Sequence, residues 1–171
     1  MSRLLDAGSE VLEELGTEDL TIRLVATRAG VSPATAYTYL ASKNHLFAEL
    51  YLRHIAAHPA PAPKGTLTRR LQGVSRHYAT TLFHHPHLAA AANIALLSSD
   101  ADVERLRLRI GSEFFDRFAA ASDGELDPAL LDTLSFAFSG ALLQAGMGLL
   151  SAEDLADRLD GVIALAVKGM R

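Results

Sequence analysis

The sequence has no cysteine among its 171 residues. Disulfide bonds, thiolate metal sites and cysteine nucleophiles are therefore excluded. β-Branched residues are sparse, and no stretch alternates apolar and polar residues for long, which argues against β-strands. Alanine and leucine dominate an apolar content of 49%. This composition predicts a folded, all-helical protein.

Long hydrophobic runs are also missing. The longest strongly apolar stretch, residues 136–150, is too short to span a bilayer and contains Gln144. No basic segment is followed by an apolar run and a small-residue cleavage site, so no signal peptide is predicted. We therefore expect a soluble, cytoplasmic protein with no membrane partner.

Acidic residues are absent from one part of an otherwise acidic chain. The formal net charge is −4, which alone disfavours a nucleic-acid partner. From Leu20 to Ala48, however, there is no acidic residue, while Arg23, Arg28 and Lys43 are present. An acid-free window with several cations is what a local contact with DNA phosphates needs.

Helical periodicity, N-cap residues and helix breakers divide the chain into about nine helices. A proline-rich stretch, residues 58–65, is the clearest internal boundary. It separates an N-terminal helical domain, residues 1–57, from a C-terminal helical domain, residues 66–171. Among the predicted helices are segments 22–29, a short one from 33, 43–57, 101–121 and 129–150.

Two of these helices, joined by a turn at Gly30–Ser32, have the outline of a helix-turn-helix. Around the axis of the second one, Ala36 and Leu40 face the core, while Ala34 and Thr38 point away. An ordinary exposed face would carry charged residues or glutamine. Small side chains instead permit close approach in a major groove, where alanine and threonine methyl groups contact thymine methyl groups.

Residues beside this face are candidates for phosphate contacts. Thr35 and Tyr37 lie on its flanks, with Tyr39 beyond Thr35, and their hydroxyls can reach phosphate oxygens. The backbone N–H groups near Ser32 and the side chain of Lys43 are suited to the same role. The alternative is that the tyrosines fill gaps between helices, and for Tyr39 both interpretations stay open.

The segments 4–16, 21–23, 25–43 and 46–47 together resemble the N-terminal domain of TetR-family transcriptional regulators. The resemblance implies that Ala34 and Thr38 face bases. It implies DNA-backbone contacts by five residues: Thr21, Thr35, Tyr37, Tyr39 and Lys43. It also implies that the C-terminal domain, residues 66–171, binds a small effector and forms a homodimer.

The short helix that begins at residue 33 differs from this family in the residues that point away from the core. Thr38 stands where the family often has arginine or another long side chain. No arginine on this helix is available to grip a guanine. Base reading would therefore lean on methyl contacts, on Arg23 or Arg28, or on DNA shape.

A helix predicted over residues 129–150 is apolar nearly all round and is not easily buried by a chain of this size. Gly140, Gln144 and Gly148 form an i, i+4, i+8 row that permits close approach of another helix. The last helix offers apolar residues at matching period: Leu155, Leu159, Val162 and Ile163. We expect both helices to pair with their symmetry mates in a four-helix dimer interface. The alternative is that they only complete the core of one chain.

Aromatic bulk with a few polar groups is the usual lining of a small-molecule pocket. Six residues combine in this way and predict an apolar or weakly polar effector: Tyr78, Phe83, Asn93, Phe114, Phe118 and Gln144. The alternative is that such faces are plain core. His54 and His58 have a spacing that suits zinc, but no carboxylate pattern accompanies them, so neither a metal nor a cofactor is predicted.

Together these features predict a ligand-responsive repressor that binds palindromic operator DNA as a homodimer and is released by its effector. In the homodimer, the short helices that begin at residue 33 of each subunit would lie about 34 Å apart, which is one turn of DNA. The alternative is a helical interaction protein with a degenerate DNA-binding domain, which the negative net charge favours. No nucleophile elbow, glycine-rich phosphate loop or paired carboxylates support an enzyme.

Overall fold

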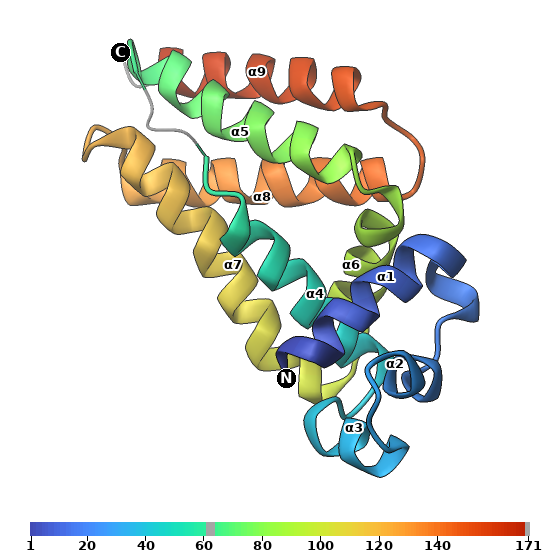
Figure 1. Ribbon diagram of the computed structural model, residues 1–171. Helices are drawn as coiled ribbons and strands as arrows, with labels where there is room; N and C mark the ends of the chain where they lie inside the picture. The colour runs from blue at the N-terminus through green and yellow to red at the C-terminus, as the bar shows by residue number, and fades with distance from the viewer. Residues whose placement is uncertain (61–63, 170–171) are drawn as a thin grey trace. The chain divides into compact units, whose positions relative to one another are not determined.

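The computed structural model of the protein describes residues 1–60 and 64–169 and confirms the all-helical prediction (Figure 1). Within those residues there are nine helices and no strand. In chain order they are α1 (Ser2–Asp19), α2 (Ile22–Arg28), α3 (Pro33–Tyr39), α4 (Lys43–Ala57), α5 (Leu67–Phe83), α6 (Pro86–Leu97), α7 (Ala101–Ser122), α8 (Pro128–Gly146) and α9 (Ala152–Gly169). Residues 61–63 of the predicted proline-rich break lie outside the described part of the chain.

The chain divides into two compact units, and both are discontinuous in sequence. Unit 1 comprises Met1–Ala57 and His85–Ile110, and unit 2 comprises the described residues of His58–His84 and Gly111–Arg171. Helix α7 therefore begins in unit 1 and ends in unit 2. The domain boundaries predicted from the sequence, at residues 57 and 66, remain a prediction.

In unit 1, helices α1, α4 and α6 pack against one another, α2 packs on α1, and α3 packs on α2 (Figure 1). The inward residues recur at helical spacing. Val11 and Leu12 of α1 and Leu46 and Phe47 of α4 are at most 1% exposed. Burial of these side chains fixes the platform on which α2 and α3 rest.

Helix α1 bends at Gly16, whose φ of 73° and ψ of −172° form a combination that essentially only glycine adopts. The structure shows an interruption, after which helical residues continue to Asp19. A Cβ atom at this position would lie 3.3 Å from Nδ1 of His87. After the bend, Leu20 is fully buried.

Side-chain hydrogen bonds cap the starts of several helices. Thr21, Ser32 and Ser151 each accept, through the side-chain oxygen, a hydrogen bond from the backbone N–H three residues later, at 3.2, 3.1 and 3.1 Å. Asp127 does the same two residues later, for the N–H of Ala129 at 2.7 Å. These bonds satisfy donors that have no partner inside the helix.

In unit 2, α5 and α9 lie side by side and α8 packs against α9 (Figure 1). Four aromatic residues, each at most 8% exposed, form an aromatic cluster in its core: Tyr78, Phe114, Phe118 and Phe138. The ring centroids of Phe114 lie 5.2 Å from Tyr78 and 5.0 Å from Phe138. Rings at these separations attract one another in addition to the apolar area they bury.

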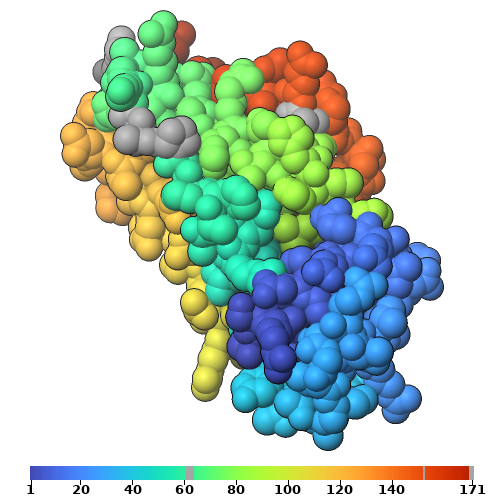
Figure 2. Space-filling view, viewed as in Figure 1, coloured from blue at the N-terminus to red at the C-terminus, as the bar shows by residue number. Residues whose placement is uncertain are grey.

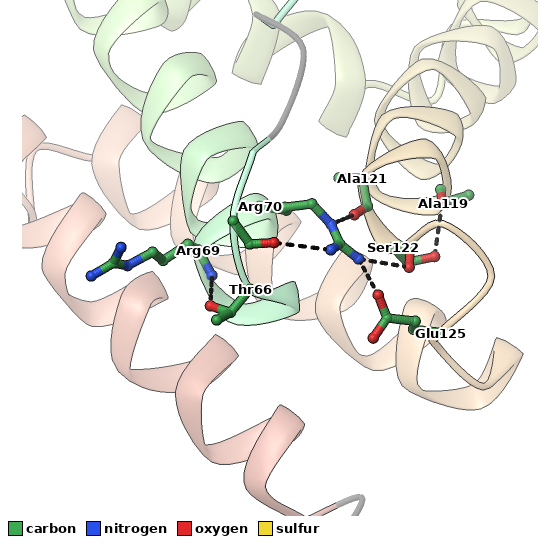
Figure 3. A network of polar contacts seen from close by, with 8 residues as sticks. Thr66, Arg69, Arg70, Ala119, Ala121, Ser122 and Glu125 are labelled. Carbon is green, nitrogen blue, oxygen red and sulfur yellow. Dashed lines mark hydrogen bonds and ion pairs between the residues drawn. The ribbon is translucent and has the colours of Figure 1, made fainter.

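Arg70 of α5 closes the C-terminal end of α7 (Figure 3). Its Nε donates to the carbonyl oxygen of Ala121 at 2.7 Å, and Nη2 donates to that of Ser122 at 3.1 Å. The same guanidinium donates to the carbonyl oxygen of Gly65 and pairs with the carboxylate of Glu125. Because the last carbonyls of a helix lack internal partners, this side chain acts as a cap supplied from another helix.

Helix α8 ends at Gly146, whereas the sequence predicts an end at Leu150. Met147 caps the helix and Gly148 has a left-handed φ of 74°. The prediction that Gly140, Gln144 and Gly148 form a row along one helix is therefore wrong for Gly148, which lies beyond the end of α8. The chain leaves the helix before it reaches Gly148.

By length and composition, α8 is apolar enough to cross a membrane, and it is the single such helix in the described part of the chain. The longest strongly apolar stretch of the sequence begins at Phe136, whereas the helix already begins at Pro128. Length and composition alone are weak evidence for a membrane span. Within α8, 17% of the 18-residue segment that meets this criterion is buried, so most of the helix is uncovered.

Candidate DNA-binding surface

Helices α2 and α3 are joined by a tight turn. Gly30 has φ of +67°, in the left-handed region that favours glycine. The N–H of Val31 then donates to the carbonyl oxygen of Ala26 at 3.0 Å. Ser32 caps α3 and Pro33 takes its first position, where a missing N–H costs nothing. The predicted turn between the two helices is therefore present.

Helix α3 buries one side and exposes the other. Ala36 and the capping residue Leu40 have no exposed surface, as predicted. The other side carries five exposed residues without charge: Ala34, Thr35, Tyr37, Thr38 and Tyr39. The two tyrosines are each 50% exposed. Figure 2 shows α2 and α3, in light blue and cyan, at the surface of unit 1. Contacts of these residues with DNA remain a prediction.

The hydroxyl groups of α3 are partly engaged inside the helix. Thr38 Oγ1 donates to the carbonyl oxygen of Ala34 at 3.0 Å. Ser32 Oγ and Thr35 Oγ1 lie 2.9 Å apart, so these two hydroxyls share a hydrogen bond. Because the proton of Thr38 is used locally, this residue offers its methyl group and the oxygen lone pairs to an outside partner. A methyl group is what contact with thymine requires.

Two glutamates that precede the acid-free window in sequence, Glu10 and Glu14, lie next to one of its cations, Arg28. Nη1 and Nη2 of Arg28 lie 2.9 and 2.7 Å from the carboxylate oxygens of Glu14, and Nη1 lies 3.3 Å from Glu10. The hydrogen bonds to Glu14 and Glu10 raise the pKa of Arg28, and the bond from Arg28 lowers the pKa of Glu14. Arg28 is thus already neutralised. This pairing was not predicted, although Glu10 and Glu14 stand one helical turn apart.

Arg23 of α2 and Lys43 of α4 have positive charges that no carboxylate among the described residues pairs. Arg23 is exposed and has no ion-pair partner among the described residues. Lys43 Nζ donates to the backbone oxygen of Glu18 at 3.0 Å and lies 5.8 Å from the ring centroid of Phe47. A carbonyl oxygen orients the ammonium group without cancelling its charge. Thr21, which caps α2, is also exposed.

The residues predicted to line an effector pocket are only partly brought together. Tyr78, Phe114 and Phe118 belong to the aromatic cluster of unit 2, where burial raises the pKa of Tyr78. Phe138 completes this cluster and was not predicted, because its helix is apolar nearly all round and gives no inward face. The other three predicted residues lie elsewhere: Phe83 at the end of α5, Gln144 exposed on α8, and Asn93 on α6 of unit 1.

The residues predicted for a dimer interface fall into two groups. Leu155, Leu159 and Ile163 are at most 3% exposed within one chain, because α9 packs on α5 and α8. The others are exposed: Gly140, Gln144, Gly148 and Val162. Apolar residues that the prediction omitted are between 56% and 78% exposed in the same segments: Phe136, Met147, Leu149 and Leu165.

Histidines contribute to contacts inside unit 1. The rings of His54 and His85 lie 4.9 Å apart, centroid to centroid, and Nδ1 of His85 lies 3.5 Å from a carboxylate oxygen of Glu13. In the described part of the chain no group of three or more histidine, aspartate or glutamate side chains is placed to hold a metal ion.

Comparisons with known proteins agree with this geometry. The family model described as bacterial regulatory proteins, tetR family, matches residues 4–50. An uncharacterized HTH-type transcriptional regulator of Mycobacterium tuberculosis is 41% identical over 170 residues, which cover 98% of this chain and 80% of the relative. A regulator of the same description from Mycobacterium bovis is equally similar.

Solved structures show the same fold. A TetR transcriptional regulator from Rhodococcus sp. RHA1 aligns with a TM-score of 0.81 at 21% identity, over 97% of this chain and 93% of that chain. FadR of Thermus thermophilus, a TetR-family repressor in complex with lauroyl-CoA, aligns with a TM-score of 0.75 at 18% identity, over 99% and 94% of the two chains. The residues that the family model matches include all of α2, the turn and α3. The chain belongs to the TetR family of bacterial transcriptional regulators, which bind DNA through a helix-turn-helix.

Proposed function

We propose that the protein is a ligand-responsive repressor that binds palindromic operator DNA as a homodimer. A small apolar or weakly polar effector releases it from the DNA. The exposed, uncharged face of α3, together with the cations Arg23 of α2 and Lys43 of α4, is the observation that carries this proposal. A face of alanine, threonine and tyrosine suits close approach in a major groove, and the two cations suit the flanking phosphates.

The homodimer is supported by apolar surface that a single chain leaves uncovered. Phe136 of α8 is 78% exposed and Leu165 of α9 is 72% exposed. Exposed apolar residues gathered on neighbouring helices mark association sites in soluble proteins. Because three leucine and isoleucine positions of α9 are used in the chain's own core, the interface we propose uses the exposed residues of α8 and α9. Two-fold symmetry then requires a palindromic operator.

The effector is proposed from the chemistry of unit 2. Its aromatic cluster offers apolar contacts, and Tyr78 adds one hydroxyl group. FadR of Bacillus subtilis, solved in complex with stearoyl-CoA, aligns with a TM-score of 0.64 at 19% identity. This fold therefore accommodates a fatty-acyl ligand in that protein and in the Thermus FadR. An effector releases DNA when it favours an arrangement in which the two α3 helices no longer match one DNA turn.

Selection of bound DNA from a random pool, using the purified protein, tests the proposed function. We expect enrichment of an inverted repeat whose half-site centres are about 10 base pairs, or a small multiple, apart. Failure to enrich any sequence, together with salt-independent affinity for random duplex, would instead support a helical interaction protein whose DNA-binding domain is degenerate. The negative net charge and the neutralised Arg28 are the observations that favour this second candidate.

Two substitutions on α3 separate phosphate contacts from base contacts. Tyr37→Phe removes a hydroxyl on the flank and is expected to weaken binding to every operator variant about equally. Thr38→Ala removes the outward methyl group and is expected to change preference at particular base pairs, by about 1 kcal/mol. Fluorescence anisotropy with a set of single-base operator variants measures both effects. A uniform loss for Thr38→Ala on all variants would contradict its base-reading role.

The pairing of Arg28 gives a prediction that the sequence alone would not make. Arg23→Ala is expected to reduce the slope of log affinity against log salt concentration by about 1, because one phosphate contact is lost. Arg28→Ala is expected to leave that slope unchanged, because its charge is already held by Glu10 and Glu14. Titrations of random duplex at several salt concentrations compare the two variants directly. Equal slope changes would show that Arg28 leaves its glutamates when DNA binds.

A further inference from the structure

Unit 1 contains a pocket that the proposed function does not use. It has a volume of about 570 Å³ and lies between the first turns of α4 and the first turns of α7. This volume falls within the range of sites for small molecules. All of its lining residues belong to unit 1, so none of them is shared with the aromatic cluster of unit 2.

The lining of this pocket is charged on both walls. Helix α4 contributes His45 and Glu49, and α7 contributes Asp102, Arg105 and Arg109. An effector pocket for an apolar molecule would be lined mainly by apolar and aromatic side chains. The chemistry of this pocket therefore selects a different class of ligand, one that carries charge.

On the α7 wall, Arg105 and Arg109 stand one helical turn apart and therefore share a face of the helix. Within residues 1–60 and 64–169, Arg105 has no hydrogen-bond or ion-pair partner for its guanidinium group. A planar guanidinium offers paired N–H donors that match a carboxylate or phosphate group. This wall is equipped for an anionic group.

The α4 wall is equipped for a cationic group. The N–H of Ala41 donates to Nδ1 of His45 at 3.2 Å, so the ring proton is on Nε2, which lies 3.7 Å from a carboxylate oxygen of Glu49. That separation is too long for a hydrogen bond. Glu49 therefore keeps acceptor capacity for an outside donor, and Asp102 adds a second carboxylate on the opposite wall.

The two walls are held together at one end of the pocket. Ser42 Oγ, at the start of α4, donates to Oδ2 of Asp100, just before α7, at 2.5 Å. The same Ser42 oxygen accepts the backbone N–H of His45 at 3.0 Å. The two helices that carry the charged groups are therefore tied together at their starts.

We propose that this pocket binds a small zwitterion, with its anionic group on Arg105 and Arg109 and its ammonium group on Glu49 and Asp102. A DNA phosphate is a poorer occupant, because a carboxylate stands on each wall and repels it. A ligand with a single charge would leave either the two arginines or the two carboxylates without a partner. The site is independent of the proposed effector in unit 2 and of DNA binding.

Calorimetric titration with three probes of one length tests the proposal: 4-aminobutanoate, butanoate and butylammonium. The zwitterion is expected to bind the wild-type protein about tenfold more tightly than either singly charged probe. Arg105→Gln is expected to weaken the binding of 4-aminobutanoate by about tenfold without loss of helical content, since Arg105 is exposed and has no partner among the described residues. Arg69→Gln, which changes an exposed arginine of unit 2, is the matched control and is expected to bind as the wild type does.

Three outcomes would overturn the proposal. The first is that 4-aminobutanoate shows no saturable binding at millimolar concentrations. The second is that butanoate binds the wild type as tightly as the zwitterion does, which would identify a site for anions only. The third is that Arg105→Gln leaves the binding of 4-aminobutanoate unchanged but weakens binding of random duplex DNA, which would make Arg105 a phosphate contact.

Discussion

A Phe136→Glu variant is expected to be a monomer at micromolar concentrations at which the wild-type protein is a dimer. Phe136 is 78% exposed in a single chain, so the change should leave the fold of unit 2 intact. In an apolar interface the new carboxylate would lose its water without gaining a partner, which should weaken the dimer by about 100-fold or more. Operator affinity should fall as well, because two half-sites are no longer bound by one molecule. Light scattering and sedimentation velocity measure the change in mass.

Leu108→Glu is the matched control for this experiment. Leu108 is 70% exposed, lies on the part of α7 that belongs to unit 1, and receives the same charge. We expect this variant to remain a dimer. A wild-type protein that is monomeric, or a Phe136→Glu variant that stays dimeric while its circular dichroism is unchanged, would contradict an interface built on α8.

An Arg70→Ala variant is expected to lose about 2–4 kcal/mol of unfolding free energy. The Arg70 side chain is 16% exposed and donates to the carbonyl oxygens of Gly65, Ala121 and Ser122. Its removal leaves the end of α7 without its cap and Glu125 without its partner (Figure 3). Urea denaturation followed by circular dichroism measures the loss as a lower midpoint at an unchanged slope.

Arg69→Ala provides the comparison for Arg70. Arg69 is exposed, and the contact that involves it in the described structure is made by its backbone N–H to Thr66. Its replacement is expected to change the unfolding free energy by less than about 0.5 kcal/mol. Similar losses for the two variants would show that the charge of this helix, and not the carbonyl contacts of Arg70, stabilises the protein.

Features set by neighbours in sequence were predicted well. The starts of α2, α3 and α9 follow from Thr21, Ser32 and Ser151, since each cap is a bond to a backbone group three residues away. The inward and outward faces of α3 follow from helical geometry, and Ala36 is buried as expected. Local chemistry and periodicity therefore sufficed for the helix-turn-helix, whereas the family followed from the resemblance of the N-terminal segments.

Features set by packing between helices were not predicted. The capture of Arg28 by Glu14 depends on how α2 lies against α1, which no pattern within either segment specifies. The burial of Leu155, Leu159 and Ile163 depends on α5, and the same spacing would have suited a partner chain equally well. The pocket between α4 and α7 joins residues more than fifty positions apart. Because charged residues are common at the starts of helices, their presence in the sequence did not predict this pocket.

The discontinuity of unit 1 has a consequence for the order in which the protein is made. Its core needs α6, which packs on α1 and α4. A ribosome that has released only residues 1–57 has therefore supplied the residues that would contact DNA without all the helices that support them. The chain must continue through α5, which belongs to unit 2, before α6 emerges. Completion of the unit 1 core during synthesis thus waits for α6, so the surfaces of α1 and α4 that α6 covers are exposed in nascent chains until then.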